Sequence, residues 1–312
     1  MIDLHTHSNF SDGSLTPTEI AERASALGIS TIALTDHDST ASYEEMRQAC
    51  ETFDLDYITG TEISLIDPLF PRTSTSGSSR PRGVHVLAYF VDMHPDSSMQ
   101  RILTDLRIDR EQRNAALVEI LRKNGFDRLD IETIAAKLPH PETLGRPHIV
   151  EAMFDLHPEI MGERNSENWA RAFHDWLGTT GKAYIPKTEL SLDDVVAKVA
   201  GSGTVFSVAH PLLNYLTDYT TSSIEREMPA IIRSLKDRGF VGVEAYYGST
   251  PEPIRSLMVK LTRDAGMIPT GGSDFHGAFK PDVALGVGLT GDLHVPDHVA
   301  DELREASSRA AA

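Results

Sequence analysis

The sequence is poor in cysteine, in basic charge and in long apolar runs. Its 312 residues contain a single cysteine, Cys50, so an intrachain disulfide framework and a cysteine-based zinc site are excluded. We expect Cys50 to be a small buried side chain. Asp and Glu outnumber Lys and Arg by 46 to 29, and the formal net charge of −17 disfavours affinity for long duplex nucleic acid. No run reaches the ~18 apolar residues of a membrane helix, and the N-terminus does not resemble a signal peptide. A cytoplasmic protein without a membrane partner is therefore expected.

The sequence does contain a regular alternation of short apolar strands and helical segments. Seven strands are expected, at residues 2–5, 29–34, 57–65, 84–91, 205–209, 240–245 and 267–270. The first helix opens with the capping box Thr16-Pro17-Thr18-Glu19. This order predicts an α/β fold, either a parallel barrel or an incomplete one. The stretch 67–83, rich in Pro, Ser, Thr, Gly and Arg, is predicted to be a long surface loop.

Residues 95–186 interrupt this alternation, because helical periodicity dominates there and strand signals are almost absent. We therefore predict a barrel domain formed by residues 1–94 and 187–312, with residues 95–186 as a helical insertion that caps the barrel mouth. Two elements of this region suit phosphate binding: Gly145-Arg146-Pro147-His148, and Lys187 on the return to the barrel. The alternatives are a helix start at Pro147 with an exposed Arg146, and a surface lysine in a loop.

Metal-ligating residue types stand at or near the ends of successive predicted strands, which meet at one face of a parallel barrel. The first strand ends in His5-Thr6-His7, whose spacing of two points both imidazoles to the same side. A lone histidine near a strand is more often a hydrogen-bonded structural residue. Burying all the histidines and carboxylates at these strand ends together would be unfavourable without metal. These residues are His5, His7, Asp12, His37, Glu62, His85, His210, Asp274 and His276.

Ligands that are all nitrogen or oxygen suit Zn²⁺, Mn²⁺ or Fe²⁺. The nine residues exceed what one tetrahedral ion needs, so two or three divalent ions are expected. Ions roughly 3.5–4 Å apart clamp the oxygens of an in-line displacement, which favours phosphoester hydrolysis. Asp36 and Asp38 are further candidates for supporting or proton-transfer roles.

The ordered motifs His-x-His, Ser-Asp-Gly, Thr-Asp-His, Gly-x-Glu, His-Pro and Ser-Asp-x-His resemble those of the polymerase and histidinol phosphatase (PHP) superfamily. The resemblance extends over residues 2–290 apart from the insertion. It implies a distorted seven-stranded (β/α)7 barrel with a trinuclear metal centre. It also implies that His5, His7, Glu62 and Asp274 bind one ion and that Glu62, His85 and His210 bind a second. Asp12, His37 and His276 would bind the third.

The insertion with its Gly-Arg-Pro-His and Pro-Lys elements is similar to that of the nucleoside 3′,5′-bisphosphate phosphatase branch. This resemblance implies that Arg146, His148 and Lys187 hold a substrate phosphate. Asp274, Glu62 and His148 would be catalytic. The substrate would be a small nucleotide such as adenosine 3′,5′-bisphosphate, and the products would be AMP and phosphate. Alternatives are a histidinol-phosphate phosphatase, a 5′–3′ exonuclease on short RNA, and a metal-binding module without activity.

Overall fold

The computed structural model describes residues 1–73, 79–140, 144–178, 181–185 and 190–312. The chain divides into two compact units. The first unit contains Met1–Ile102 and Glu189–Ala312, and the second contains Leu103–Thr188. Each unit has a hydrophobic core of its own.

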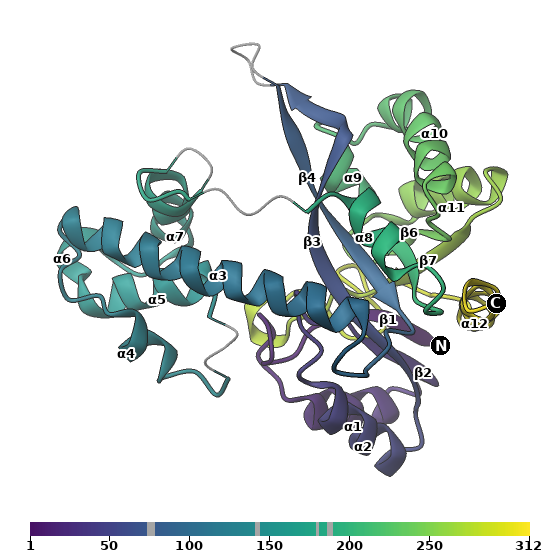
Figure 1. Ribbon diagram of the computed structural model, residues 1–312, viewed down its shortest axis with the longest axis horizontal. Coiled ribbons are helices and arrows are strands. Elements are labelled where there is room, and N and C mark those ends of the chain that lie inside the picture. Colours follow the sequence, from purple (N-terminus) through teal and green to yellow (C-terminus); the bar gives the residue numbers. More distant parts are fainter. Residues whose placement is uncertain (74–78, 141–143, 179–180, 186–189) are drawn as a thin grey trace. The chain divides into compact units, whose positions relative to one another are not determined.

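The first unit is built on one seven-stranded sheet, ordered from β1 to β7 as in the chain (Figure 1). The strands are β1 (Ile2–Thr6), β2 (Thr31–Leu34), β3 (Asp56–Thr73), β4 (Ser79–Tyr89), β5 (Val205–Val208), β6 (Gly242–Tyr247) and β7 (Ile268–Gly272). The sheet closes where the amide of His7 donates to the carbonyl of Phe275 at 2.9 Å and the amide of Asp274 donates to that of His5 at 2.8 Å. Gly272 lies at this seam, where a Cβ atom would come within 2.4 Å of the His5 nitrogen. The expected distorted (β/α)7 barrel is confirmed.

Strand β4 corrects the expectation of an all-parallel barrel. It pairs antiparallel with β3 and with β5, whereas the other neighbouring strands pair in parallel. The prediction of a long surface loop at residues 67–83 was also wrong. Strands β3 and β4 continue through most of this stretch as a hairpin, and their pairing reaches Thr73 and Ser79. The composition is misleading here, since a two-stranded arm that leaves the barrel has no core face and needs no apolar alternation.

Buried Asp67 anchors the base of this hairpin. Its carboxylate accepts a hydrogen bond from the Tyr215 hydroxyl at 2.8 Å and from Nη1 of Arg238 at 3.1 Å. Tyr215 ends α9 (Pro211–Tyr215), and Arg238 follows α10 (Thr221–Asp237). The hairpin and two helical segments are thereby fixed to one another.

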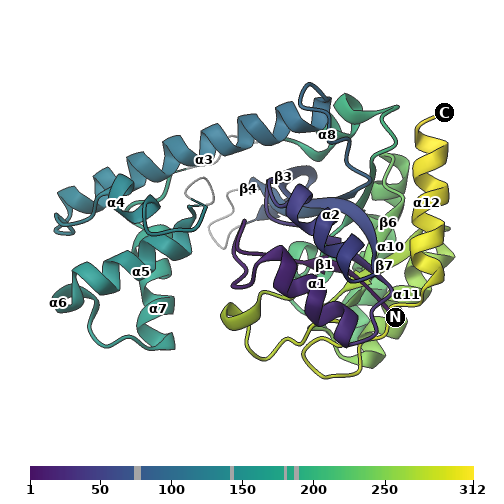
Figure 2. The same cartoon turned by 90° about the horizontal axis from the view of Figure 1, so that it is seen from below.

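Helices cover the outside of the barrel, and Figure 2 shows α12 (His298–Ala310) running alongside it. Next to β2 lie α1 (Pro17–Ala26) and α2 (Tyr43–Thr52), which bury Ile20, Met46 and Cys50. The burial of Cys50 and the capping box of α1 confirm the two local expectations. The remaining elements are α8 (Leu192–Val199), α11 (Glu252–Asp264) and η3 (Gly277–Phe279). None of the helices that the structure describes combines the length and hydropathy of a membrane span.

Helices are the regular elements of the second unit among its described residues. It contains most of α3 (Ser98–Lys123) and all of α4 (Ile131–Ala135), α5 (Arg146–Leu156), α6 (Pro158–Met161), α7 (Ser166–Ala172) and the π-helix η2 (Phe173–Leu177). Its core is formed by residues such as Leu121, Phe126, Ile149 and Met153. The capping role of this unit stays a prediction.

Candidate metal centre

Strand β1 brings three polar side chains into the barrel because alternate residues of a strand share a face. Asp3, His5 and His7 are completely buried, and so are Ile2 and Leu4, which alternate with them and belong to the apolar core. Asp3 lies deepest at the β7 seam, where its carboxylate accepts hydrogen bonds from the amide and hydroxyl of Ser273 at 2.9 and 2.6 Å. The two imidazoles follow toward the barrel mouth.

Glu62 lies at the centre of the cluster, and each of its oxygens faces a different set of imidazoles. Oε2 lies 3.2–3.3 Å from ring nitrogens of His5, His7 and His37. Oε1 lies 3.0 Å from Nδ1 of His85 and 2.9 Å from Nε2 of His210. A carboxylate placed between two groups of nitrogen donors has the arrangement of a bridging ligand.

The position of His85 follows from the reversed direction of β4. His85 pairs with Ser64 of β3 in the register of the antiparallel hairpin. Because β4 runs antiparallel to its neighbours, residues that come before the C-terminal end of β4 reach the end of the barrel where the parallel strands have their C-termini. His85 therefore joins a cluster at the C-terminal face although it does not stand at the C-terminal end of its own strand.

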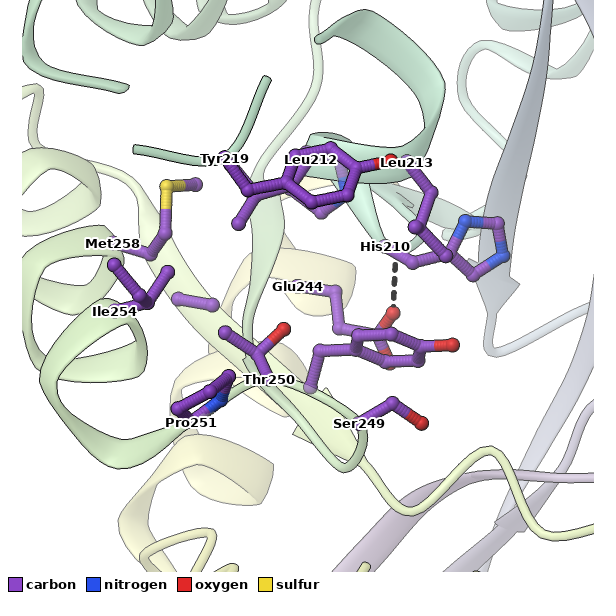
Figure 3. A pocket seen from close by; sticks show the side chains of 13 residues that line it. His210, Leu212, Leu213, Tyr219, Glu244, Ser249, Thr250, Pro251, Ile254 and Met258 are labelled. Atoms are coloured by element: carbon purple, nitrogen blue, oxygen red, sulfur yellow. Dashed lines mark hydrogen bonds between the residues drawn. The ribbon is translucent and has the colours of Figure 1, made fainter. Parts of the chain in front are cut away.

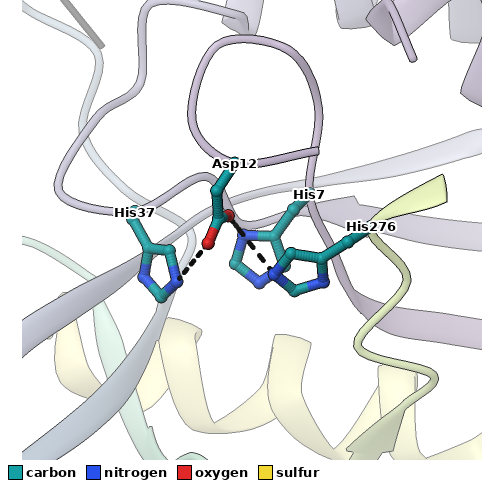
Figure 4. Close-up of side chains that lie close together, drawn as sticks. All are labelled: His7, Asp12, His37 and His276. Carbon is teal, nitrogen blue, oxygen red and sulfur yellow. Dashed lines mark ion pairs between the residues drawn. The ribbon is translucent and has the colours of Figure 1, made fainter. Parts of the chain in front are cut away.

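A second group surrounds Asp12, as Figure 4 shows. Its Oδ1 lies 3.2 Å from Nε2 of His276, and its Oδ2 lies 3.6 Å from Nε2 of His37. Nδ1 of His7 lies 3.7 Å from Oδ1. His7 thus belongs to this group as well as to the group that it forms with His5 and Asp274. The resemblance implied only Asp12, His37 and His276 here.

Asp274 closes the group around β1. Its Oδ1 lies 3.4 Å from Nε2 of His7 and 3.5 Å from Nε2 of His5. The backbone of Asp274 has a φ of +58°, a conformation that Asp and Asn tolerate better than most residues. His210 also has a positive φ, of +25°. Two unusual backbone conformations therefore occur at residues of the cluster, as is common at functional sites.

The donor atoms have the spacing of a metal shell. A tetrahedral shell with bonds of about 2.1 Å separates its ligand atoms by roughly 3.4 Å. The nitrogens of His5 and His7 and the oxygens of Glu62 and Asp274 lie 3.1–3.5 Å from one another across these pairs. In addition, Nδ1 of His7, His37 and His210 is buried without a hydrogen-bond partner within the described part of the chain. Buried polar atoms of this kind are normally satisfied, so the residues fit a set of divalent ions.

Two hydrogen bonds fix which imidazole nitrogens face the cluster. Nδ1 of His276 lies 2.8 Å from the carbonyl oxygen of Asp274, which can only accept, so Nδ1 carries the proton and Nε2 keeps its lone pair. Nδ1 of His5 lies 2.8 Å from Oε1 of Glu244, which leaves Nε2 as the donor atom toward the cluster. Such partners orient histidine ligands and increase their basicity.

Burial and charge coupling together leave His37 and Glu62 in their ligand forms, whereas they favour the protonated form of His5. Burial lowers the pKa of His37 to about 4, and the opposing attraction of Glu62 does not compensate, so this imidazole is neutral near pH 7. Burial alone would raise the pKa of Glu62, but His37 and His5 hold it well below its ordinary value. For His5, burial acts to lower the pKa, and Glu244, Glu62 and Asp274 together raise it well above its ordinary value. Metal binding at His5 therefore has to displace a proton.

All nine residues predicted at the strand ends converge on this one end of the barrel. Asp36 has a supporting place beside them: it accepts hydrogen bonds from the hydroxyls of Ser8, Ser11 and Ser42 at 2.6–2.8 Å. It thereby holds the turn that carries Asp12.

The predicted phosphate-binding residues Arg146 and His148 belong to the second unit. Both are in the first turn of α5. Nδ1 of His148 accepts a hydrogen bond from the amide of Gly145 at 3.0 Å, which gives this ring a part in capping the helix. Arg146 is half-buried and donates to the carbonyl of Leu177 at 3.2 Å, so it is not the exposed side chain of the alternative interpretation. Lys187 lies outside the described residues.

Three residues beside the cluster were missed from the sequence. Glu244 is buried in β6 and bonds both His5 and the amide of His210, the latter at 2.6 Å. The hydroxyl of Tyr247 and Nζ of Lys280 donate to Oδ2 of Asp274 at 2.9 and 2.7 Å. A carboxylate in the otherwise apolar strand Phe240–Ala245 was the available signal for Glu244.

Comparison with known proteins identifies the family. Residues 3–157 match the model of the PHP domain. A 5′–3′ exoribonuclease of Haemophilus influenzae is 27% identical to this chain, and the alignment covers 88% of this chain and 89% of the exoribonuclease. A 3′,5′-nucleoside bisphosphate phosphatase of Chromobacterium violaceum is 26% identical to this chain, and the alignment covers 88% of this chain and 87% of the phosphatase. A solved structure from Bifidobacterium adolescentis, assigned as a metal-dependent phosphoesterase, has a TM-score of 0.73 and 28% identity, and covers 97% of this chain and 95% of that one. The chain belongs to the PHP family and is a metal-dependent phosphoesterase.

Proposed function

We propose that this enzyme hydrolyses the 3′-phosphate of nucleoside 3′,5′-bisphosphates and leaves a nucleoside 5′-monophosphate and phosphate. The observation that carries the proposal is the placement of Glu62 between two sets of imidazoles, with Asp12 and Asp274 completing the donor set. Divalent ions held by these residues would supply a nucleophile from water and neutralise phosphoryl oxygens. The nine predicted ligands would hold the ions, and Mn²⁺, Fe²⁺ and Zn²⁺ all suit this set.

The nucleotide class of the substrate is supported by the relatives. The Chromobacterium violaceum phosphatase aligns with 88% of this chain, an extent that requires the helical unit as well as the barrel. A bisphosphate presents a second anion for cations outside the cluster. Arg146 fits this role, because burial and the nearby Arg113 both lower its pKa, and a bound anion would relieve the repulsion between the two guanidinium groups. His148 and Lys187 remain the other candidates.

Lys280 supplies a cation at the metal centre itself. Its side chain is 39% exposed, and its Nζ contacts the outer oxygen of Asp274. An amine that is both held by a cluster carboxylate and open to solvent is placed to donate to an oxygen of the reacting phosphate.

A second candidate is 5′–3′ trimming of short RNA. The Haemophilus influenzae exoribonuclease is similar to this chain over the same extent as the phosphatase. The same cluster would serve both reactions. The net charge of −17 disfavours tight binding of long strands, so short RNA is the expected substrate of this reaction.

The proposal is tested with the Mn²⁺-loaded protein on adenosine 3′,5′-bisphosphate, a labelled RNA oligomer and histidinol phosphate. We expect fastest release of phosphate from the bisphosphate. The control is Asp274→Asn, because Asn accepts the positive φ of this position and keeps the bonds to Tyr247 and Lys280. We expect this variant to retain the melting temperature of the metal-free wild type and to lose at least ~100-fold in kcat. Preferred release of nucleotides from RNA would replace the proposal with the second candidate.

A further inference from the structure

A cavity of about 300 Å³ opens beside the metal centre within the first unit (Figure 3). Its walls come from the start of α9, from the end of β6 and from α11 with the turn that precedes it. Tyr219 and Leu213 stand on one side and Ile254 and Met258 on another, as the close-up shows. Tyr219 and Leu213 are 47% and 44% exposed, so large apolar side chains face solvent at the cavity.

The cavity shares a wall with the metal centre. His210 lines it, while Nε2 of the same ring lies 2.9 Å from Glu62. Tyr247 also lines it, and its hydroxyl donates to Asp274 at 2.9 Å. The rings of His210 and Tyr247 are 5.5 Å apart between centroids. A ligand with its phosphate at the cluster can therefore extend its organic part into this cavity.

The chemistry of the walls selects an uncharged group. Among the described residues that line the cavity there is no lysine or arginine. Glu244 is the only carboxylate there, and both of its oxygens are already bonded, to His5 and to the amide of His210. Apart from His210, Ser249 and Thr250, the remaining walls are aliphatic side chains, the thioether of Met258, two proline rings and the phenol rings of Tyr219 and Tyr247. A second phosphate is disfavoured here, whereas a flat heterocycle would bury its faces against aromatic and aliphatic surfaces.

We propose that this cavity binds the nucleobase of the substrate; the inference rests on the proposed function and adds the place of the base to it. The volume lies at the lower end of the range for ligand pockets, which suits one base rather than a stacked pair. The polar side chains that can meet the base edge are the hydroxyl of Thr250 and that of Ser249, which also bonds Tyr247. The cavity therefore binds bases by their faces and discriminates weakly among them, as stacking sites do.

The test uses two variants and two matched controls. Tyr219→Ala removes an exposed ring from the cavity, and Ile254→Trp fills the cavity from α11. The controls are Leu27→Ala, an exposed apolar residue that ends α1, and Ser256→Trp, on the exposed face of α11. Circular dichroism and melting temperature establish that each variant is folded. Kinetics with adenosine 3′,5′-bisphosphate and inhibition by AMP and by inorganic phosphate are then compared.

For Tyr219→Ala and Ile254→Trp we expect roughly tenfold increases in KM and in the inhibition constant of AMP. Inhibition by inorganic phosphate should change less than twofold, because phosphate does not enter the cavity. The four common bases in the bisphosphate should differ by less than about tenfold in kcat/KM. If the wild type hydrolyses the bisphosphate and neither variant alters KM, the base lies elsewhere and the cavity proposal is overturned. If the wild type hydrolyses no nucleotide, the proposed function itself fails.

Discussion

Glu244 and His5 are 239 residues apart in the sequence and 2.8 Å apart in the barrel, where Oε1 of the carboxylate bonds Nδ1 of the ring. The other oxygen of Glu244 accepts a hydrogen bond from the backbone amide of His210 at 2.6 Å. One buried side chain in β6 thus orients a ligand on β1 and fixes the backbone of another after β5. Because His210 has a φ of +25°, this second bond also supports an unfavourable backbone conformation.

Replacing Glu244 by Gln should weaken metal binding. The amide oxygen can still accept from His5, but the amide NH₂ group then faces the His210 amide, and two donors oppose each other. We expect the affinity for Mn²⁺ or Zn²⁺ to fall ~10–100-fold, measured by competition with a chelating dye. Glu252→Gln, exposed at the start of α11, is the control. An unchanged affinity in Glu244→Gln would show that this carboxylate does not position the ligands.

Replacing Lys280 by Ala should lower turnover more than it lowers metal content. The amine contacts Oδ2 of Asp274, which faces away from the nitrogens of His5 and His7. We expect kcat to fall about tenfold or more, because a preorganised cation near the phosphate is lost. Metal stoichiometry by elemental analysis should be retained, and Lys280→Arg should restore part of the activity. Lys260→Ala serves as the control, because it removes a lysine that pairs with Asp264 on the surface of α11.

Much of the metal centre was predictable because its information is local. His5 and His7 follow from the period of a strand, and the capping box of α1 follows from four consecutive residues. The β3–β4 hairpin was not predictable, because its pairing is satisfied by backbone hydrogen bonds and leaves no apolar pattern beyond the barrel.

The supporting residues were hidden for a different reason. Glu244 looks like an isolated acid in an apolar strand until the fold brings β1 and His210 to it. Lys280 lies just after the short η3 element, and no periodicity marks the contact with Asp274. Such contacts depend on how distant segments close the barrel, which one sequence does not encode in a readable pattern.

Adding metal to chelator-treated protein should raise its melting temperature. Nδ1 of His7, His37 and His210 is buried without a hydrogen-bond partner among the described residues, and metal ligation satisfies buried nitrogens of this kind. A free metal concentration of 100 times Kd stabilises the folded state by about 2.7 kcal/mol. For a chain of this size we expect a shift of roughly 5–10 °C with Mn²⁺ in differential scanning fluorimetry. The same titration of Asp274→Asn should give a smaller shift. Equal shifts in the two proteins would place the stabilising ions outside the cluster.

Raising the pH should destabilise the fold through Cys50. Burial, with a smaller contribution from Asp56, raises the pKa of the thiol to about 12 from its ordinary value of 9.0. The folded state therefore holds the thiol proton more tightly than the unfolded state. The resulting advantage is complete below pH 9.0 and is lost progressively as the pH rises toward about 12.

Urea unfolding at pH 8 and at pH 10.5 measures this loss, which cannot exceed about 1.4 kcal/mol per pH unit for one group. Cys50→Ala is the control, because it removes the titrating thiol from the same position in α2. We expect the stability of the variant to decline less steeply with pH than that of the wild type. Reaction with a thiol reagent at pH 8 should also be slow in the folded protein and rapid in urea, since the side chain is 2% exposed. Rapid labelling of the folded protein, or identical pH slopes for the two proteins, would contradict the burial of this thiol.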